Sequence, residues 1–423
     1  MGAAIEILAD IETRHRPAAA ALKDWGVSHR FAGSGDRAAI GNIVYDALRW
    51  RASSAWIMGE ESPRAAVLAT VARRWRLGAD GIARAVAGDS HAPEAPSTEE
   101  AARLGDADLD AAPAHVRADV PEWLAPRLEE ALGADWVAEG EALAQRPPLD
   151  LRVNALKADR DRAGKALARF GAAATQHSPV GLRIPPTTES GRHPNVQVEP
   201  GFRKGWFEVQ DEGSQIAALA VAAKPGEQVL DLAAGAGGKT LALAAAMANT
   251  GQVHATDGDR GRLAPIFERL KRAGTRNVQV HEAGAELEEL AGKMDAVLVD
   301  APCTGTGVWR RHPDAKWRLR ERAIGERAAE QDRLLAGAAN YVKPGGRLVY
   351  VTCSLLPEEN DRRVAAFLAA HAAFQAVPPA DVVARAGLDA GLANAALTSD
   401  RGLLLTPHRT GTDGFFVAVM ARG

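Results

Sequence analysis

The sequence predicts a multidomain protein in which a doubly wound α/β domain follows a small α+β unit and an all-helical N-terminal domain. Its 423 residues exceed the length of one ordinary domain. From Gly205 onward, short apolar segments alternate with helix-length segments, which is typical of a parallel sheet. Before about residue 88, apolar residues recur at helical spacing instead.

Four regions follow one another along the chain. In the first, Ile40, Ile43, Val44 and Leu48 have helical spacing after Asp36, a capping candidate. The second is rich in Pro, Ala and acidic residues, which is typical of a linker. The third combines a helical pair with a strand, a helix and a further strand. We therefore expect a helical domain at 1–88, a linker at 89–120, a helical pair with an α+β unit at 121–204 and the α/β domain at 205–423.

Five short apolar segments predict the parallel strands of the last domain. They are QVLDLAAG, GQVHATD, VQVHEAG, MDAVLVDAPC and GGRLVYVTCS. The C-terminal GLLLTPHRTGTDGFFVAVM adds two strands joined by a Gly-containing turn, which predicts an antiparallel hairpin at one edge. In such sheets, ligands bind beyond the carboxyl ends of the strands, where the strand order reverses.

The charge totals exclude a protein that is basic throughout. The net charge is −3, so any contact with nucleic acid must come from local patches. The densest is RRHPDAKWRLRER, Arg310 to Arg322, for which a solvated helix face is the alternative interpretation. The acidic N-terminus lacks the basic start of a signal peptide, and no apolar run approaches the ~18 residues of a membrane span. We expect a cytoplasmic protein without a membrane anchor; the oligomeric state is not determined, and a monomer is compatible with the sequence.

A glycine-rich turn follows the first strand of the α/β domain. The segment Val229 to Thr240 reads VLDLAAGAGGKT, and its glycines let backbone N–H groups at a helix N-terminus approach a ligand. Asp257 ends the second strand, where doubly wound folds place an acid on ribose hydroxyls. These features are consistent with NAD or with S-adenosylmethionine (SAM).

The chain has two cysteines, Cys303 and Cys353, and each follows a predicted strand. A free cysteine is often a buried small hydrophobe, and a disulfide is another alternative. Two cysteines without a secretory signal favour free thiols in a reducing compartment. If the fourth and fifth strands are neighbours, about 4.8 Å apart, both thiols project into one crevice. This placement favours chemistry over packing.

Several motifs resemble those of the SAM-dependent RNA 5-methylcytosine methyltransferases of the RsmB/NOP2/Sun type. DAPCTGTGVWRRHPDAKW resembles the family's motif IV, VTCSLLPEEN its motif VI and DLAAGAGGKT its motif I. FEVQDEGSQ is similar to the segment that leads into the catalytic domain, LRVNALK to an RNA-binding strand, and FAGSGDRAAIGNIVYDALRW to the NusB-like domain of the bacterial RsmB branch. The resemblance implies a Rossmann-like class I methyltransferase domain, an RRM-like α+β unit and a NusB-like RNA-binding domain.

The resemblance also implies the reaction. C5 of cytosine becomes nucleophilic after a thiolate adds at C6. By this resemblance Cys353 is the nucleophile, Cys303 assists product release, and Asp300 hydrogen-bonds the N3/N4 edge of the base. A capping carboxylate is the alternative role of Asp300.

The family's cofactor site corresponds to the glycine-rich turn and two nearby acids. The residues that it assigns to SAM are Ala233, Ala234, Gly235, Ala236, Gly237, Gly238, Lys239, Asp257 and Asp300. Ala233 and Ala236 replace the usual Cys and Pro of motif I. Gly284 stands where the family has an Asp that contacts adenine, so the adenine contact is unassigned. No metal is expected.

RNA is the expected partner, with 16S rRNA as the first choice of substrate. The residues expected to contact it are Arg152, Asn154, Arg310, Arg311 and Lys316, with Trp317 as stacking surface or as core. Two alternatives stay open: a tRNA cytosine-5 methyltransferase, and a non-catalytic RNA-binding or ribosome-assembly protein. An amino-group methyltransferase or an NAD enzyme is disfavoured, because the fourth strand ends in DAPC.

Overall fold

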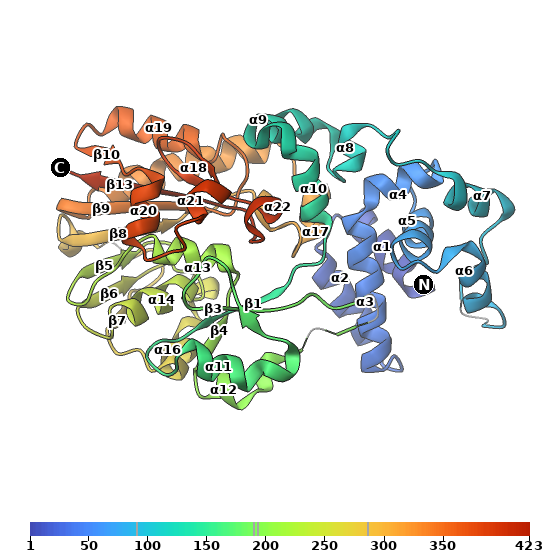
Figure 1. Cartoon of the computed structure of the whole chain (residues 1–423), viewed down its shortest axis with the longest axis horizontal. Coiled ribbons are helices and arrows are strands. Elements are labelled where there is room, and N and C mark those ends of the chain that lie inside the picture. The colour runs from blue at the N-terminus through green and yellow to red at the C-terminus, as the bar shows by residue number, and fades with distance from the viewer. Residues whose placement is uncertain (90–91, 189–190, 193, 286) are drawn as a thin grey trace. The chain divides into compact units, whose positions relative to one another are not determined.

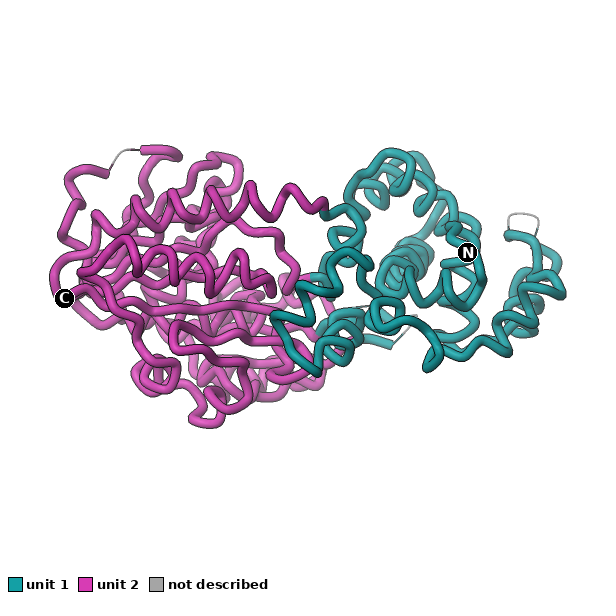
Figure 2. The backbone as a smooth tube through the Cα atoms, turned by 90° about the horizontal axis from the view of Figure 1, so that it is seen from above, with its two compact units in different colours: residues 1–147, 187–193, 309–319 teal, residues 148–186, 194–308, 320–423 magenta. Residues whose placement is uncertain are grey.

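A computed structural model describes residues 1–89, 92–188, 191–192, 194–285 and 287–423. The chain divides into two compact units, coloured separately in Figure 2. Unit 1 comprises Met1–Pro147, Thr187–His193 and Trp309–Leu319, and unit 2 comprises Pro148–Pro186, Pro194–Val308 and Arg320–Gly423. Among the described residues, no helix combines the length and the apolar character needed to cross a membrane.

Unit 1 is helical, as the sequence predicts for its N-terminal part. Ile7, Val44 and Leu68, from three different helices, are buried in one shared core. Its helices are α1 (Gly2–Arg14), α2 (Ala18–Ser28), α3 (Ser34–Arg49), α4 (Arg51–Met58), α5 (Pro63–Ala69), α6 (Gly78–Val86), α7 (Thr98–Asp106), α8 (Ala114–Arg117), α9 (Ala125–Leu132), α10 (Trp136–Ala144) and α17 (Pro313–Arg318). The likeness to NusB stays a prediction.

Part of the stretch expected to be a linker is helical. Ser97 and Glu100 form a capping box at the start of α7, and Leu104 is buried in the core of unit 1. Residues 90 and 91 of this stretch lie outside the described residues. The helical pair α9 and α10 also belongs to unit 1, so the chain passes to unit 2 between Pro147 and Pro148. Two consecutive prolines cannot continue a helix, which explains a boundary at this position.

Unit 2 begins with a four-stranded sheet in the order β2-β3-β1-β4. Leu151, Leu167 and Phe207 form its core. The sequence predicts FEV, residues 207–209, at the start of the α/β domain. In the structure these residues form β4, which pairs antiparallel with β1 and completes the small sheet. The elements are β1 (Leu149–Val153), α11 (Arg160–Leu167), β2 (Ala173–Ala174), β3 (Gly181–Ile184), α12 (Pro200–Arg203) and β4 (Phe207–Val209).

A large sheet in the order β11-β12-β13-β9-β8-β5-β6-β7 forms the rest of unit 2 (Figure 1). The strands β5 to β9 are parallel, and the order reverses between β5 and β8. The antiparallel strands β12 and β13 form the C-terminal hairpin. The sequence predictions of a doubly wound sheet and of this hairpin are confirmed. The strands are β5 (Gln228–Asp231), β6 (Gln252–Ala255), β7 (Val278–Val280), β8 (Met294–Asp300), β9 (Val342–Thr352), β10 (Phe374–Ala376), β11 (Leu397–Thr398), β12 (Leu403–Leu405) and β13 (Phe415–Arg422).

Helices cover the large sheet and share its core. Val229 of β5, Leu298 of β8 and Val349 of β9 are fully buried between them. The helices are α13 (Glu212–Leu219), α14 (Gly238–Ala246), α15 (Arg260–Leu263), α16 (Ile266–Ala273), α18 (Glu321–Ala339), α19 (Asp361–Ala370), α20 (Pro379–Arg385), α21 (Leu392–Ala395) and α22 (Pro407–Thr410).

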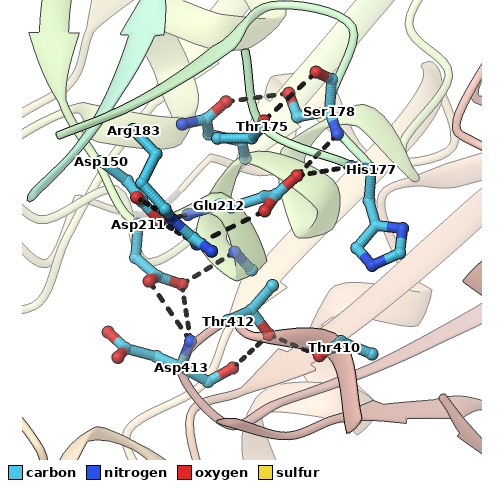
Figure 3. A network of polar contacts seen from close by, with 12 residues as sticks. Asp150, Thr175, His177, Ser178, Arg183, Asp211, Glu212, Thr410, Thr412 and Asp413 are labelled. Atoms are coloured by element: carbon cyan, nitrogen blue, oxygen red, sulfur yellow. Dashed lines mark hydrogen bonds and ion pairs between the residues drawn. The ribbon is translucent and has the colours of Figure 1, made fainter. Parts of the chain in front are cut away.

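A polar network joins the small sheet to the loop before β13 (Figure 3). Arg183 donates to both oxygens of Asp150 at 2.7 Å, and Asp150 accepts the backbone N–H of Glu212 at 3.0 Å. The neighbouring Asp211 accepts the backbone N–H of Asp413 at 3.1 and 3.2 Å. Buried charges of opposite sign that are fully hydrogen-bonded fix one geometry. The C-terminal loop is therefore held to the small sheet within unit 2.

Candidate active site

The two thiols meet beyond the carboxyl ends of β8 and β9. These strands are parallel neighbours, and Asp300 at the end of β8 lies opposite Val351 of β9. The Sγ atoms of Cys303 and Cys353 are 3.3 Å apart, and both thiols are free and half-buried. The loops that follow two neighbouring parallel strands lie at the same edge of the sheet. Two residues 50 positions apart in the sequence therefore share one site.

Two glycines allow the thiol loops to approach the C-terminal hairpin. The backbone N–H of Gly307 donates to the carbonyl of Cys353 at 2.9 Å, and Gly307 in turn accepts from the N–H of Gly414 at 2.8 Å. A Cβ on Gly307 would lie 2.2 Å from the carbonyl oxygen of Gly414. Only a residue without a side chain allows this close approach of Gly307 to Gly414, and the approach fixes the position of the Cys353 loop.

A fully buried carboxylate, that of Glu359, links the two thiol loops. Its Oε1 accepts the backbone N–H of Thr304 at 2.9 Å and the amide of Gln331 at 3.1 Å. Its Oε2 accepts the hydroxyls of Thr304 and Ser354. Thr304 follows Cys303 and Ser354 follows Cys353, so one side chain fixes both loops. Sequence reasoning did not single out Glu359, although it lies within VTCSLLPEEN.

The surroundings of Cys303 keep its thiol in the protonated form. The contact with Cys353, burial and the charge of Glu359 together raise the pKa of the Cys303 thiol well above its usual range. Cys303 therefore keeps its proton at neutral pH and can donate a hydrogen bond to the sulfur of Cys353. This arrangement disfavours a thiolate at Cys303.

Asp300 is paired with the lysine of the glycine-rich turn. The ammonium of Lys239 lies 2.6 Å from Oδ2 of Asp300, and the Lys239 side chain is buried whereas Asp300 is partly exposed. The same ammonium lies 5.4 Å from the ring centroid of Phe415. The structure thus fixes the carboxylate of Asp300 by an ion pair.

The glycine-rich turn lies between β5 and α14, with Asp257 against it. Gly237 has a φ of 81°, and a Cβ there would lie 2.4 Å from Ile266, so only glycine fits. The carboxylate of Asp257 accepts the backbone N–H of Gly235 at 2.9 Å and that of Asp259 at 2.8 Å. Gly284, with a φ of 73°, donates its N–H to the carbonyl of Asp257.

Beneath this turn, Asp231 carries a polar atom without a partner among the described residues. Its Oδ2 accepts the hydroxyl of Thr240 at 2.7 Å, but its buried Oδ1 has no hydrogen bond. Burial raises the pKa of Asp231 to about 7. An orphaned carboxylate oxygen, free N–H groups at the start of α14 and the fixed acid Asp257 fit a ligand that carries an ammonium group and ribose hydroxyls, as SAM does.

Two of the residues expected to contact RNA are structural. Arg152 and Asn154 are each 4% exposed. Arg152 donates to the carbonyl of Gly238 at 2.6 Å, and the amide of Asn154 donates to the carbonyls of Gly205 and Ala273 at 2.9 Å. Both side chains bind the small sheet to the glycine-rich turn and to α16, so we do not retain them as RNA contacts.

Most of the basic segment after Cys303, up to Leu319, belongs to unit 1. Lys316 is 1% exposed and donates to the carbonyl of Arg49 at 3.1 Å, and burial lowers its pKa to about 8. Trp317 donates to the carbonyl of Leu48 at 2.6 Å, and Arg310 is buried as well. The interpretation of a solvated face is wrong for Arg310 and Lys316, and we do not retain them as RNA contacts. Arg311 is half-buried, and its predicted role stays open.

Comparison with known proteins agrees with this architecture. Residues 218–421 match the family model described as 16S rRNA methyltransferase RsmB/F, and residues 120–188 match that of the ferredoxin-like domain of RsmF/B-like methyltransferases. The chain belongs to the RsmB/F family. The matched residues 218–421 include the two thiol loops and the glycine-rich turn of this chain.

Two relatives named ribosomal RNA small subunit methyltransferase B show the extent of the match to the RsmB/F family. The Citrobacter koseri protein is 38% identical over 306 residues, covering 71% of this chain and 66% of its own length. The Klebsiella pneumoniae protein is 40% identical over 251 residues, covering 59% of this chain and 57% of its own. The chain thus spans 66% of the length of the first relative and 57% of the length of the second.

Solved structures resemble the RsmB/F chain over most of its length. The crystal structure of PH0851 is 27% identical with a TM-score of 0.73, covering 99% of this chain and 98% of that one. A methyltransferase homolog protein from Pyrococcus horikoshii is 27% identical with a TM-score of 0.59, covering 73% of this chain and 98% of its own. These likenesses confirm the Rossmann-like methyltransferase fold that the sequence predicts.

Proposed function

We propose that this chain methylates C5 of a cytosine in RNA, with 16S rRNA as the substrate, and uses SAM as methyl donor. The observation that carries the proposal is the pair of thiols at 3.3 Å next to the Asp300–Lys239 ion pair. Neither NAD chemistry nor amino-group methylation needs two adjacent thiols. Membership of the RsmB/F family supports the same reaction.

Cys353 is the nucleophile in this proposal. Its thiolate forms a bond to C6 of cytosine, the C5–C6 double bond opens, and the ring gains electron density at C5. A proton from water reaches N3, and Asp300 holds the N3/N4 edge of the base. C5 then takes the methyl group that SAM supplies when bound.

Cys303 acts on the product in this proposal. The methylated adduct carries both a proton and a methyl group on C5. Removal of that proton re-forms the C5–C6 double bond and expels the Cys353 thiolate. Cys303 lies within reach of the same carbon, because its sulfur is 3.3 Å from the attacking sulfur. To act as the base, Cys303 first releases its proton to water, and its raised pKa then makes the thiolate a strong base for the proton on C5.

The residues of the glycine-rich turn are the proposed SAM site. The orphaned Oδ1 of Asp231 and the N–H groups at the start of α14 suit the charged methionine end of the donor. Asp257 suits the ribose hydroxyls, because two backbone N–H groups fix its carboxylate. The contact to adenine stays unassigned.

Methyl transfer to defined RNAs by the purified chain tests this proposal. We expect incorporation from labelled SAM into 16S rRNA, and bisulfite sequencing of rRNA from cells with and without the gene names the cytosine. Incorporation into tRNA alone supports the tRNA enzyme instead. A chain that binds RNA but shows no incorporation into either RNA and no SAM binding by calorimetry supports the non-catalytic alternative.

A further inference from the structure

A basic face lies on unit 2 around α11, α12 and α16, which Figure 1 shows together. Residues 157–170, 199–208 and 268–276 contain eleven Lys and Arg against five Asp and Glu, whereas the whole chain has a net charge of −3. Contacts in the structure join these segments. Arg272 of α16 stacks on Phe202 of α12, and Lys157 packs against Gly274 at the end of α16.

The five acids of these segments do not balance the exposed cations, since only Asp159, Asp161 and Glu268 among them are exposed. Glu208 is buried and bonds Arg269 and Arg272, and Glu199 is buried and bonds Arg169. The cations left exposed are Lys157, Arg162, Lys165, Arg203, Lys204, Lys271 and Arg276. Like charges at this density repel one another, and an anionic partner relieves that repulsion.

An aromatic ring lies at the centre of the basic face. The guanidinium of Arg162 lies 4.2 Å from the ring centroid of Trp206, and the ammonium of Lys204 lies 5.4 Å from the same centroid. Trp206 is only half-buried. A planar ring flanked by two cations offers stacking for a base and neutralisation for the adjoining phosphates.

The basic face is connected to the glycine-rich turn through α16. Arg269 donates to the carbonyl of Ala236 in that turn at 2.9 Å, and Ile266 packs under Gly237. A helix of eight residues is about 12 Å long, so the face begins within that distance of the turn. A strand bound there therefore lies on the same unit as the two thiols.

We propose that this face, centred on Arg162, Lys204 and Trp206, binds a single-stranded segment of the RNA substrate. The proposal rests on the proposed function and replaces the buried Arg152, Asn154 and Lys316 as RNA contacts. Single-stranded RNA fits better than a folded acidic protein surface, because the half-buried ring beside two cations matches alternating bases and phosphates.

Equilibrium binding of the full chain to fluorescein-labelled 16S rRNA transcript, at several salt concentrations and without SAM, tests this proposal. For the double variant Arg162→Ala/Lys204→Ala we expect weaker binding and a salt slope smaller by about 1.4, which corresponds to two lost phosphate contacts. For Trp206→Ala we expect about tenfold weaker binding. The control is Arg333→Ala/Arg385→Ala, two exposed arginines of α18 and α20, which we expect to bind as the wild type does.

Unchanged affinity and salt slope in the double variant, with an unchanged thermal unfolding midpoint, would overturn the proposal. So would equal competition by polyglutamate at matched charge, since that result indicates a partner recognised by charge alone. The binding assay measures RNA affinity without requiring methyl transfer. Wild-type chain that binds RNA through this face without methylating it contradicts only the proposed function, and a double variant that methylates with an unchanged KM contradicts only the RNA-binding face.

Discussion

The sulfur of Cys303 lies 3.3 Å from the sulfur of Cys353, at the ends of two neighbouring parallel strands. A disulfide bond needs about 2.05 Å between the sulfurs, so a small movement of either side chain suffices. We predict that oxidised glutathione converts the pair to a disulfide, with transfer of two electrons and loss of two protons, and abolishes methyl transfer. Dithiothreitol should restore it. Mass spectrometry after iodoacetamide treatment checks this, and two alkylated cysteines in the oxidised sample would contradict it.

The buried carboxylate of Glu359 should control both the stability of the site and the titration of Cys303. In Glu359→Gln, the amide of the new side chain faces the hydroxyls of Thr304 and Ser354 and the amide of Gln331. We expect unfolding to become easier by about 1–3 kcal/mol. Loss of the negative charge should also lower the pKa of Cys303, which iodoacetamide rates against pH measure.

Two further variants separate charge from packing at Glu359. Glu359→Asp keeps the charge and should leave the pKa of Cys303 closer to the wild-type value. Glu326→Gln removes an exposed carboxylate of α18 and should change neither quantity. An identical pH profile of alkylation in wild type and Glu359→Gln would show that this carboxylate does not act on the thiol.

Asp231 should make the stability of unit 2 fall as pH rises. Burial raises its pKa from about 3.9 in the unfolded chain to about 7. Between these values the folded chain binds a proton that the unfolded chain has lost, so the stabilisation is complete below about pH 4 and lost as pH passes 7. Asp231→Asn should weaken this dependence, because an amide does not titrate in this range. The amide oxygen still accepts the hydroxyl of Thr240, so the local hydrogen bond is kept. Urea unfolding midpoints at pH 5 and pH 8 measure this pH dependence, and Asp381→Asn, at an exposed position, is the control. An equal pH dependence in Asp231→Asn and the wild type would contradict the role of Asp231.

Gly307 should be intolerant of a side chain. A Cβ at this position meets the backbone of Gly414 at 2.2 Å, and neither backbone can move without disturbing the hydrogen bond from Gly307 to Cys353. We expect Gly307→Ala to destabilise unit 2 by about 1–3 kcal/mol and to reduce methyl transfer strongly. Gly325→Ala is the matched control, because no atom lies within 4 Å of the added Cβ. Equal activity of the two variants would argue against this packing constraint.

The sequence predicts the large sheet and the meeting of the thiols because both follow from local patterns. Short apolar segments alternate with helices, and residues that follow adjacent parallel strands share one edge. Glu359 could not be found in this way. Its role depends on a carboxylate reaching back to two loops, and an acid in a loop has no pattern that distinguishes a buried hub from an exposed charge.

Four of the five predicted RNA contacts, Arg152, Asn154, Arg310 and Lys316, are buried for a related reason. Arg152 alternates with Leu151 and Val153 as a solvent-facing residue does, but the glycine-rich turn covers that face of β1, and Arg152 bonds the carbonyl of Gly238. Lys316 lies in a basic segment, yet the segment packs into unit 1. The basic face around Trp206 combines three segments that are separate in the sequence, so only their packing makes it recognisable.

Trapping of the covalent intermediate tests the central claim most directly. Incubated with 16S rRNA and SAM, Cys303→Ala should accumulate a protein–RNA adduct that survives denaturing gel electrophoresis, because the Cys353 adduct forms but is not released. Cys353→Ala and the double variant should form none. No adduct with Cys303→Ala, or an adduct that persists when Cys353 is absent, would contradict the division of roles between the two thiols.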